Sequence, residues 1–126
     1  MGKTTGRALL IVSADPPPEL EGELNRWYDE EHLADELRRV PGVVSARRYV
    51  AASAIQDEIF SGRPHPQHYS KYLTIFELET EETLGSPEYW DFLTNPTEWT
   101  RRIVRDVPIT ALVYRQVYPE EGFFTR

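Results

Sequence analysis

The sequence predicts an α+β fold built around one four-stranded antiparallel sheet. Three observations indicate it: four stretches have the composition of strands, a long amphipathic helix separates the first two, and two shorter helices separate the last two. The chain has 126 residues, of which 40% are hydrophobic and 28% charged, as expected for one soluble globular domain covering 1–126.

The first strand is predicted at residues 7–14, where a nearly continuous apolar run is typical of a strand buried on both faces. Three prolines end it, and Pro18 suits the first position of a helix. The helix is predicted to extend to residue 39, because Pro41-Gly42 stops it. A period of 3.6 residues places the following side chains on one face, with His32 at its margin: Leu20, Leu24, Trp27, Tyr28, Glu31, Ala34 and Asp35.

A second strand is predicted at 43–52 and a third at 69–79. In the third, alternation places four side chains on one side: Tyr72, Thr74, Phe76 and Leu78. Residues 54–68 between these strands include Ser61-Gly62-Arg63-Pro64 and have no period at their centre. We therefore interpret 54–68 as a loop.

Two short helices are predicted next, since Ser86 precedes Pro87 and Asn95 precedes Pro96, an N-cap residue followed by proline in each case. A final strand covers 107–118, and Pro108 near its start favours the edge of the sheet. The resulting order, β-α-β-β-α-β, is the ferredoxin-like arrangement. Its helices cover one sheet face, although the strands are apolar on both. We therefore expect a homodimer in which two sheets stack.

Composition excludes several classes of function. A net charge of −7 argues against nucleic acid and anionic membranes as partners. The chain lacks cysteine, which excludes disulfides and thiolate sites and fits a reducing compartment, so we expect a cytoplasmic protein. Dispersed glycines predict no nucleotide cofactor. His65 and His68 have a weak spacing for metal ligands in a proline-rich stretch, so we interpret them as part of a surface loop and expect no metal.

One stretch resembles a known family. Trp27-Tyr28, then His32, then the run from Val40-Pro41-Gly42-Val43 to Tyr49 is similar to the EthD-like branch of the dimeric α+β barrel superfamily. In these proteins a helix with an aromatic pair and a histidine ends in Pro-Gly and leads into the second strand. The similarity extends over roughly residues 9–118. Ala34 is a departure, because many relatives have proline there, and it predicts a straighter helix past His32.

The resemblance implies a dimeric α+β barrel with an apolar, aromatic pocket between the sheet and its helices. Enzymes of the superfamily include polyketide cyclases, muconolactone-type isomerases, small lyases and cofactor-free monooxygenases. Other members are accessory proteins without established chemistry.

His32 is the principal catalytic candidate, because an imidazole exchanges protons near neutral pH. Glu31 or Asp35 can orient it, and the phenols of Tyr28 and Tyr72 can polarise a substrate oxygen. The catalytic candidates are thus His32, Tyr72, Tyr28 and Asp35, and the candidates for substrate binding are Trp27, Glu31, Phe76, Trp90 and Trp99. The alternative for each is structural: a helix-end histidine bound to backbone or solvent, and aromatic side chains that only pack in the core.

The hypothesis from sequence is a small cofactor-independent enzyme that performs acid/base chemistry on a hydrophobic aromatic or polyketide-like molecule. The reaction would be a cyclisation, an isomerisation or an elimination. Two alternatives stay open: a cofactor-free monooxygenase of the same fold, and a non-catalytic dimeric protein that binds a ligand in the same pocket.

Overall fold

The computed structural model describes residues 8–64 and 66–126. Four strands form one sheet in the order β2-β3-β1-β4, and every neighbouring pair is antiparallel. Their bounds are Ala8–Ala14 for β1, Val43–Val50 for β2, Tyr72–Leu78 for β3 and Ile109–Arg115 for β4. The predicted α+β class, the ferredoxin-like order and the edge position of the last strand are confirmed.

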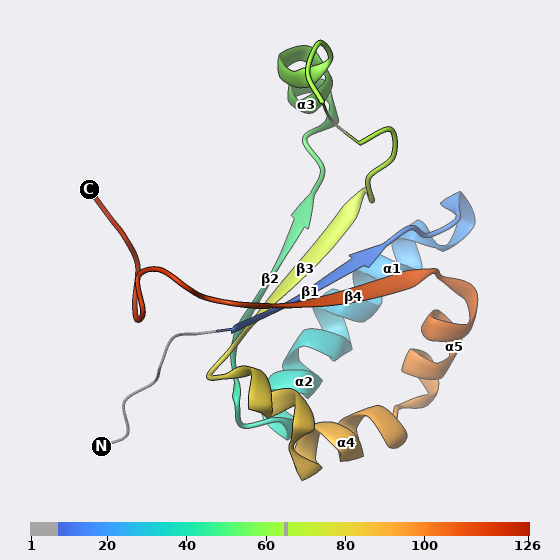
Figure 1. Cartoon of the computed structure of the whole chain (residues 1–126). Helices are drawn as coiled ribbons and strands as arrows, with labels where there is room; N and C mark the ends of the chain where they lie inside the picture. Colours follow the sequence, from blue (N-terminus) through green and yellow to red (C-terminus); the bar gives the residue numbers. More distant parts are fainter. Residues whose placement is uncertain (1–7, 65) are drawn as a thin grey trace.

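The helices that connect β1 to β2 and β3 to β4 lie on one face of this sheet (Figure 1). A continuous helical run connects β1 to β2 and consists of η1 (Pro18–Leu20), α1 (Glu21–Trp27), the π-helical η2 (Tyr28–His32) and α2 (Leu33–Arg39). The second connection contains η3 (Glu81–Gly85), α4 (Pro87–Thr94) and α5 (Glu98–Asp106). Within the described part of the chain, no helix has the length and apolar character needed to cross a bilayer.

Alternation along β3 separates the two faces of the sheet as predicted. Thr74, Phe76 and Leu78 are buried under the helices, whereas Leu73 and Ile75 point to the other face and are partly exposed. The core has two clusters. One gathers around Phe76, Leu78 and Val40, and the other around Leu24, Trp27 and Ile103. The sheet therefore has one packed face and one open face.

The π-helical segment determines which side chains of the first crossover face the sheet. Every fourth residue from 24 to 40 lies on the side toward the sheet. Four of these side chains are fully buried (Leu24, Tyr28, Glu36 and Val40), and the fifth, His32, is partly buried. In a regular α-helix four residues overshoot a turn by about 40°, so such a line would drift around the helix. The wider π turn reduces the drift. Ala34, predicted on the buried face, is exposed, and the helix continues past it.

The loop predicted for 54–68 is wrong in its first half. Ser53–Phe60 form α3, with Ile55 and Ile59 one turn apart and no glycine or proline before Gly62. Helix α3 lies beyond the ends of β2 and β3, away from the other helices (Figure 1). Its apolar side chains belong to neither core cluster of the described residues, and Ile55, Ile59 and Phe60 are exposed. His65 lies outside the described residues.

One of the two N-caps predicted between β3 and β4 is present in the structure. The Ser86 hydroxyl accepts a hydrogen bond from the Tyr89 amide at 3.1 Å, which confirms the predicted cap. The predicted cap at Asn95 is wrong, because α5 begins after Thr97, whose hydroxyl accepts from the Thr100 amide at 3.1 Å. Asn95 instead donates from its side chain to Asp91 at 2.8 Å and ends α4.

We predict that Gly42→Ala destabilises the protein by about 1–3 kcal/mol, because a side chain here overpacks the turn between α2 and β2. A Cβ at Gly42 would lie 2.2 Å from Thr83 Oγ1 and 2.7 Å from Thr83 Cγ2. Urea unfolding measures the change. Gly22→Ala is the matched control: nothing lies within 4 Å of its Cβ position in α1, and alanine should stabilise the helix by about 0.5–1 kcal/mol. A Gly42→Ala protein as stable as the wild type would contradict the close packing.

Candidate active site

A cavity of about 220 Å³ lies between the helical run 18–39 and the pair α4 and α5. Aromatic and aliphatic side chains form most of its wall, with a few polar groups. The lining residues are Trp27, Tyr28, His32, Asp35, Arg39, Phe92, Leu93, Pro96, Thr100, Val104 and Ile109. Three predicted catalytic candidates (His32, Tyr28, Asp35) and one predicted binding residue (Trp27) thus come together here.

His32 lies in an aromatic enclosure. Its ring stacks on the Trp27 indole with 4.1 Å between centroids and 22° between planes. Tyr28 presents an edge to it at 5.5 Å and Phe92 lies 5.5 Å away at a tilt. The side chain is 14% exposed. Aromatic contacts on several sides fix the plane of the imidazole, so the ring is oriented before any ligand binds.

Glu36 is the carboxylate that meets His32. Glu36 Oε1 lies 3.4 Å from His32 Nε2, one helical turn further on. The residue is 2% exposed, and its Oε2 is buried without a hydrogen-bond partner among the described residues. Sequence reasoning missed it, because a strict 3.6-residue period assigned the buried position to Asp35. The four-residue spacing from Tyr28 and His32 was the signal that would have found it.

Burial keeps both members of this pair uncharged. Desolvation lowers the pKa of His32 from 6.5 to about 4, and the Asp35 carboxylate opposes the shift. Desolvation raises the pKa of Glu36 from 4.5 to about 8, and Asp35 adds to the rise. Near neutral pH the favoured state is therefore a neutral imidazole beside a protonated carboxyl group.

Asp35 has other partners. It accepts hydrogen bonds from Arg38 and from Arg39, whose Nη1 lies 3.3 Å from Asp35 Oδ2. Arg39 also donates to the backbone oxygen of Asp91 at 3.1 Å and to its carboxylate at 3.2 Å, and it lies over the Phe92 ring. These charges form one side of the cavity wall. Asp35 acts on His32 through its field, whereas Glu36 makes the contact.

Trp27 and Glu31 attach the first crossover to α5. The Trp27 indole donates to Thr100 Oγ1 at 3.1 Å. Glu31 Oε2 accepts from the hydroxyl of Thr97 at 2.6 Å. Glu31, predicted to bind substrate, is thus engaged at the N-terminus of α5 and does not line the cavity among the described residues.

The two tyrosines predicted to be catalytic occupy different places. Tyr28 lines the cavity. Burial raises the pKa of its phenol, and a side-chain hydrogen bond with Thr74 partly opposes this rise. Tyr72 faces α1, where its hydroxyl donates to Glu21 and accepts from Asn25 Nδ2 at 3.3 Å. The Arg48 guanidinium lies over both rings, 4.3 Å from Tyr28 and 5.2 Å from Tyr72. In the described structure Tyr28 and not Tyr72 forms part of the cavity wall.

The remaining aromatic candidates are also separated. Phe76 is in the core, edge-on to His32 at 6.3 Å. Trp99 packs on the second core cluster and donates to Glu23 at 3.1 Å. Trp90 is 68% exposed on α4. None of the three belongs to the cavity wall of the described chain.

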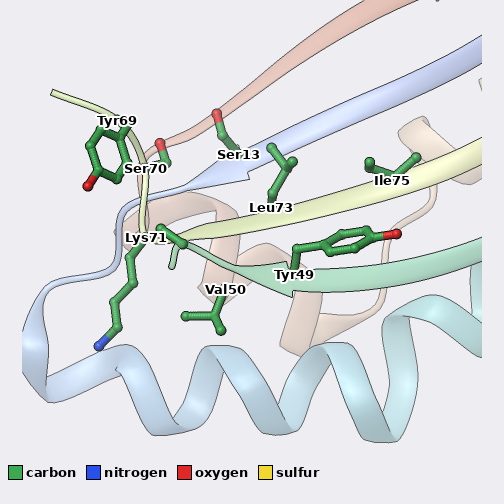
Figure 2. A pocket seen from close by; sticks show the side chains of 9 residues that line it. Ser13, Tyr49, Val50, Tyr69, Ser70, Lys71, Leu73 and Ile75 are labelled. Carbon is green, nitrogen blue, oxygen red and sulfur yellow. The ribbon is translucent and has the colours of Figure 1, made fainter. Parts of the chain in front are cut away.

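A larger hollow of about 450 Å³ lies at one end of the sheet, against β2, β3 and the segment that leads into β3. Figure 2 shows Leu73 and Ile75 on the side of β3 away from the helical run, whereas Lys71 reaches toward it, where it pairs with Glu21 at 2.6 Å. The hollow is apolar and contains no acid/base pair comparable to His32 and Glu36 among its described lining residues. The cavity at His32 is therefore the better candidate for chemistry.

In residues 8–64 and 66–126, no group of three or more acidic or histidine side chains is placed to hold a metal ion. His68 is an exposed side chain, 3.8 Å from Asp15.

We predict that the stability of wild type and of Glu36→Gln diverges as pH rises. Between pH 4.5 and about 8 the folded protein binds more protons at Glu36 than the unfolded chain does. The contribution of Glu36 to the free energy of unfolding is therefore largest below pH 4.5, and it is lost as the pH rises to about 8. For His32 the lowered pKa makes its contribution full above 6.5 and lost as pH falls toward 4. Between pH 6.5 and 8 wild type should lose free energy of unfolding relative to Glu36→Gln, by at most about 1.4 kcal/mol per pH unit. Urea unfolding at several pH values measures this, and parallel profiles would contradict it.

Comparison with known proteins supports the fold. No protein-family model and no curated protein sequence matches the chain. Among solved structures, an ethyl tert-butyl ether d (EthD) family protein from Bacillus halodurans has a TM-score of 0.55 at 13% identity, covering 88% of this chain and 99% of its own. A proposed antibiotic biosynthesis monooxygenase from Nitrosomonas europaea has a TM-score of 0.56 at 14% identity, and the match covers 94% of this chain and 98% of the other.

A heme-degrader from Mycobacterium tuberculosis, whose structure has two hemes bound in its active site, is similar with a TM-score of 0.52 at 11% identity, covering 87% of this chain and 95% of the other. Identities this low carry information on fold and none on chemistry. The chain thus has the fold of these α+β proteins, which agrees with the resemblance of the stretch from Trp27 to Tyr49 to the EthD-like branch.

Proposed function

We propose that this protein is a small cofactor-independent enzyme that performs acid/base chemistry on a compact hydrophobic molecule, by cyclisation, isomerisation or elimination. The observation that supports it is His32: an imidazole held uncharged in the wall of an apolar cavity, with a buried carboxyl group behind it. A neutral imidazole is a base that can take a proton from a carbon acid. A titratable group in a cleft whose pKa is strongly shifted by burial is a recurrent feature of functional sites.

The cavity favours a compact aromatic ligand. Its 220 Å³ is below the range of about 300–1,000 Å³ for pockets that hold drug-sized ligands. Trp27 and Phe92 offer ring faces and Val104 an aliphatic wall. We infer a substrate with one substituted ring, or one ring of a larger polyketide-like molecule.

In the proposed reaction His32 accepts a proton from a carbon next to a carbonyl group, and the electron pair of the broken C–H bond passes into the developing enolate. The Tyr28 phenol stays protonated, because burial raises its pKa, and it can donate to the enolate oxygen. His32 then returns the proton to a different atom of the substrate. Tyr72, predicted to share this role, is held at α1 by Glu21 and Asn25.

Two alternatives use the same cavity. The Nitrosomonas protein, described as a monooxygenase, favours a reaction of oxygen with an electron-rich phenol that His32 deprotonates. A second alternative is a binding protein without catalysis. The heme-degrader raises the possibility of haem, but the residues here do not fit it: a haem exceeds a cavity of 220 Å³, and His32 Nε2 faces Glu36.

We also propose that two chains stack through their open sheet faces to form the predicted dimeric α+β barrel. Leu9 and Ile11 of β1 and Leu73 and Ile75 of β3 alternate with the buried residues and point to that face, as does Leu112 of β4, which is 51% exposed. An apolar surface of this extent is typical of an interface. The cytoplasmic location is a further prediction, made from the sequence.

We predict that His32→Gln lowers the rate of proton exchange by about 10²–10⁴-fold, the usual contribution of a general base. The probe is a panel of hydroxyphenyl ketones in D₂O, in which NMR follows deuterium uptake next to the carbonyl group. His68→Gln is the matched control, since His68 is 80% exposed, and it should exchange as the wild type does.

The same panel separates the alternatives. Binding without exchange favours the binding protein, and oxygen consumption with a phenol favours the monooxygenase. Exchange that survives in His32→Gln would remove His32 from the reaction.

We predict that Ile75→Glu converts a dimer to a monomer, because the substitution places two like charges in the apolar interface. Sedimentation velocity measures the mass. Leu37→Glu, on the outer surface of α2 at 37% exposure, is the control and should stay dimeric. A wild-type chain that sediments as a monomer would contradict the stacked barrel.

A further inference from the structure

We infer that His32 and Glu36 form a two-residue proton relay, in which His32 exchanges a proton with the substrate through Nδ1 while Glu36 exchanges one with Nε2. Glu36 is then a positioning residue that acts through His32. This inference rests on the proposed function and deepens it, because it names where the proton comes from and where it goes.

The geometry places the two groups in series. His32 is part of the cavity wall, whereas Glu36 is 2% exposed and does not line the cavity in the described structure. The 3.4 Å between Glu36 Oε1 and His32 Nε2 is slightly long for a hydrogen bond. Such contacts are often long in unliganded active sites and shorten when substrate binds. Since Nε2 faces Glu36, the Nδ1 nitrogen is left for a molecule in the cavity.

Each step balances. When the pair acts as an acid, the Nδ1–H bond breaks and a bond forms between that proton and the substrate, while the Glu36 O–H bond breaks and an Nε2–H bond forms. The imidazole stays neutral and the carboxylate takes the negative charge. When the pair acts as a base, it starts from the Nε2–H imidazole beside ionised Glu36: the substrate C–H bond breaks and Nδ1 takes the proton, while the Nε2–H bond breaks and Glu36 takes that proton. No imidazolium ion forms, which matters because the aromatic enclosure of Trp27 and Phe92 solvates a cation poorly.

The unpartnered oxygen is the second observation. Glu36 Oε2 is buried and has no hydrogen-bond donor among the described residues. A permanently ionised carboxylate would be costly there, whereas a protonated one leaves a weaker acceptor unpaired. For packing alone, an apolar side chain of similar volume would fill this position without the cost of desolvating a carboxyl group. Its burial next to the imidazole therefore favours a role in proton transfer.

Other charged groups surround the relay. On the helical run, Asp35 raises the pKa of both members, and Arg39 lies beyond it. From α4, Tyr89 faces Glu36, and burial together with that carboxyl raises the pKa of Tyr89 to about 12. Asp91 pairs with Arg39. Tyr89 therefore keeps its proton between pH 6 and 9, where the relay is tested.

The first experiment needs no substrate. NMR of ¹⁵N-labelled histidine follows the His32 ring from pH 6 to 9. The relay predicts Nδ1–H with Nε2 unprotonated at pH 6 and a switch to Nε2–H as Glu36 ionises. Glu36→Gln should stay in the Nδ1–H tautomer throughout, because its amide donates to Nε2 as the protonated acid does but has no proton to lose. Asp35→Asn should move the switch to lower pH.

Glu30→Gln is the matched control: it removes an exposed carboxylate of the same segment, paired with Arg26 at 3.5 Å, and should leave the switch unchanged. An imidazolium signal that titrates near pH 6.5, or identical titrations in wild type and Glu36→Gln, would overturn the relay.

The second experiment uses the exchange assay. Glu36→Gln should lower kcat at least tenfold with KM within twofold, and its kcat should no longer change where Glu36 titrates. If His32→Gln abolishes exchange but Glu36→Gln retains the wild-type rate and pH profile, the relay is wrong and the proposed function stands. If the tautomer switch is present but His32→Gln still exchanges, the proposed function is wrong and the coupling of the two groups stands.

Discussion

The burial of the His32–Glu36 pair under the helices depends on one irregular turn of helix. The π-helical segment Tyr28–His32 keeps side chains four residues apart on the face toward the sheet, and so brings a histidine and a glutamate into the same interior. Without it the helix would rotate Glu36 away and put Asp35 or Ala34 in its place. π turns are frequent at functional sites, and here the reason is geometric: the extra residue turns the His32–Glu36 pair, which lies one regular helical turn apart, toward the same side as Leu24 and Tyr28.

The aromatic residues around this pair set its electrostatics. Trp27 and Phe92 provide polarisable surfaces but no strong acceptor, so an imidazolium ion or a carboxylate has little to replace its lost water. The polar groups nearby are occupied: Asp35 with two arginines, Glu31 with Thr97. The cavity wall thus contains one imidazole with a buried carboxyl group behind it, amid mostly apolar side chains with a few polar groups, the distribution expected of a small-molecule site.

The sequence predicted the sheet and much of the helical layer, because these follow from local patterns. Alternation in β3 identified Thr74 and Phe76 as interior, and Ser86 before Pro87 marked a helix start. The cap at Thr97 was missed because Asn95-Pro96 has the same local signature two residues earlier. Glu36 was missed because a periodicity argument assumes a regular helix, and α3 because the aperiodic centre of 54–68 was taken to represent the whole segment. A repeated local signature, an irregular helical turn and an exposed helix thus account for the three differences.

The alternation of side chains along β3 has a consequence for the evolution of this sequence. Phe76 belongs to the interior beside His32, and Ile75, the next residue, to the opposite surface. Substitutions at neighbouring positions therefore act on separate properties and can accumulate independently. An insertion or deletion of one residue within the strand would exchange both surfaces at once. Length, more than composition, is the quantity that selection must hold constant here.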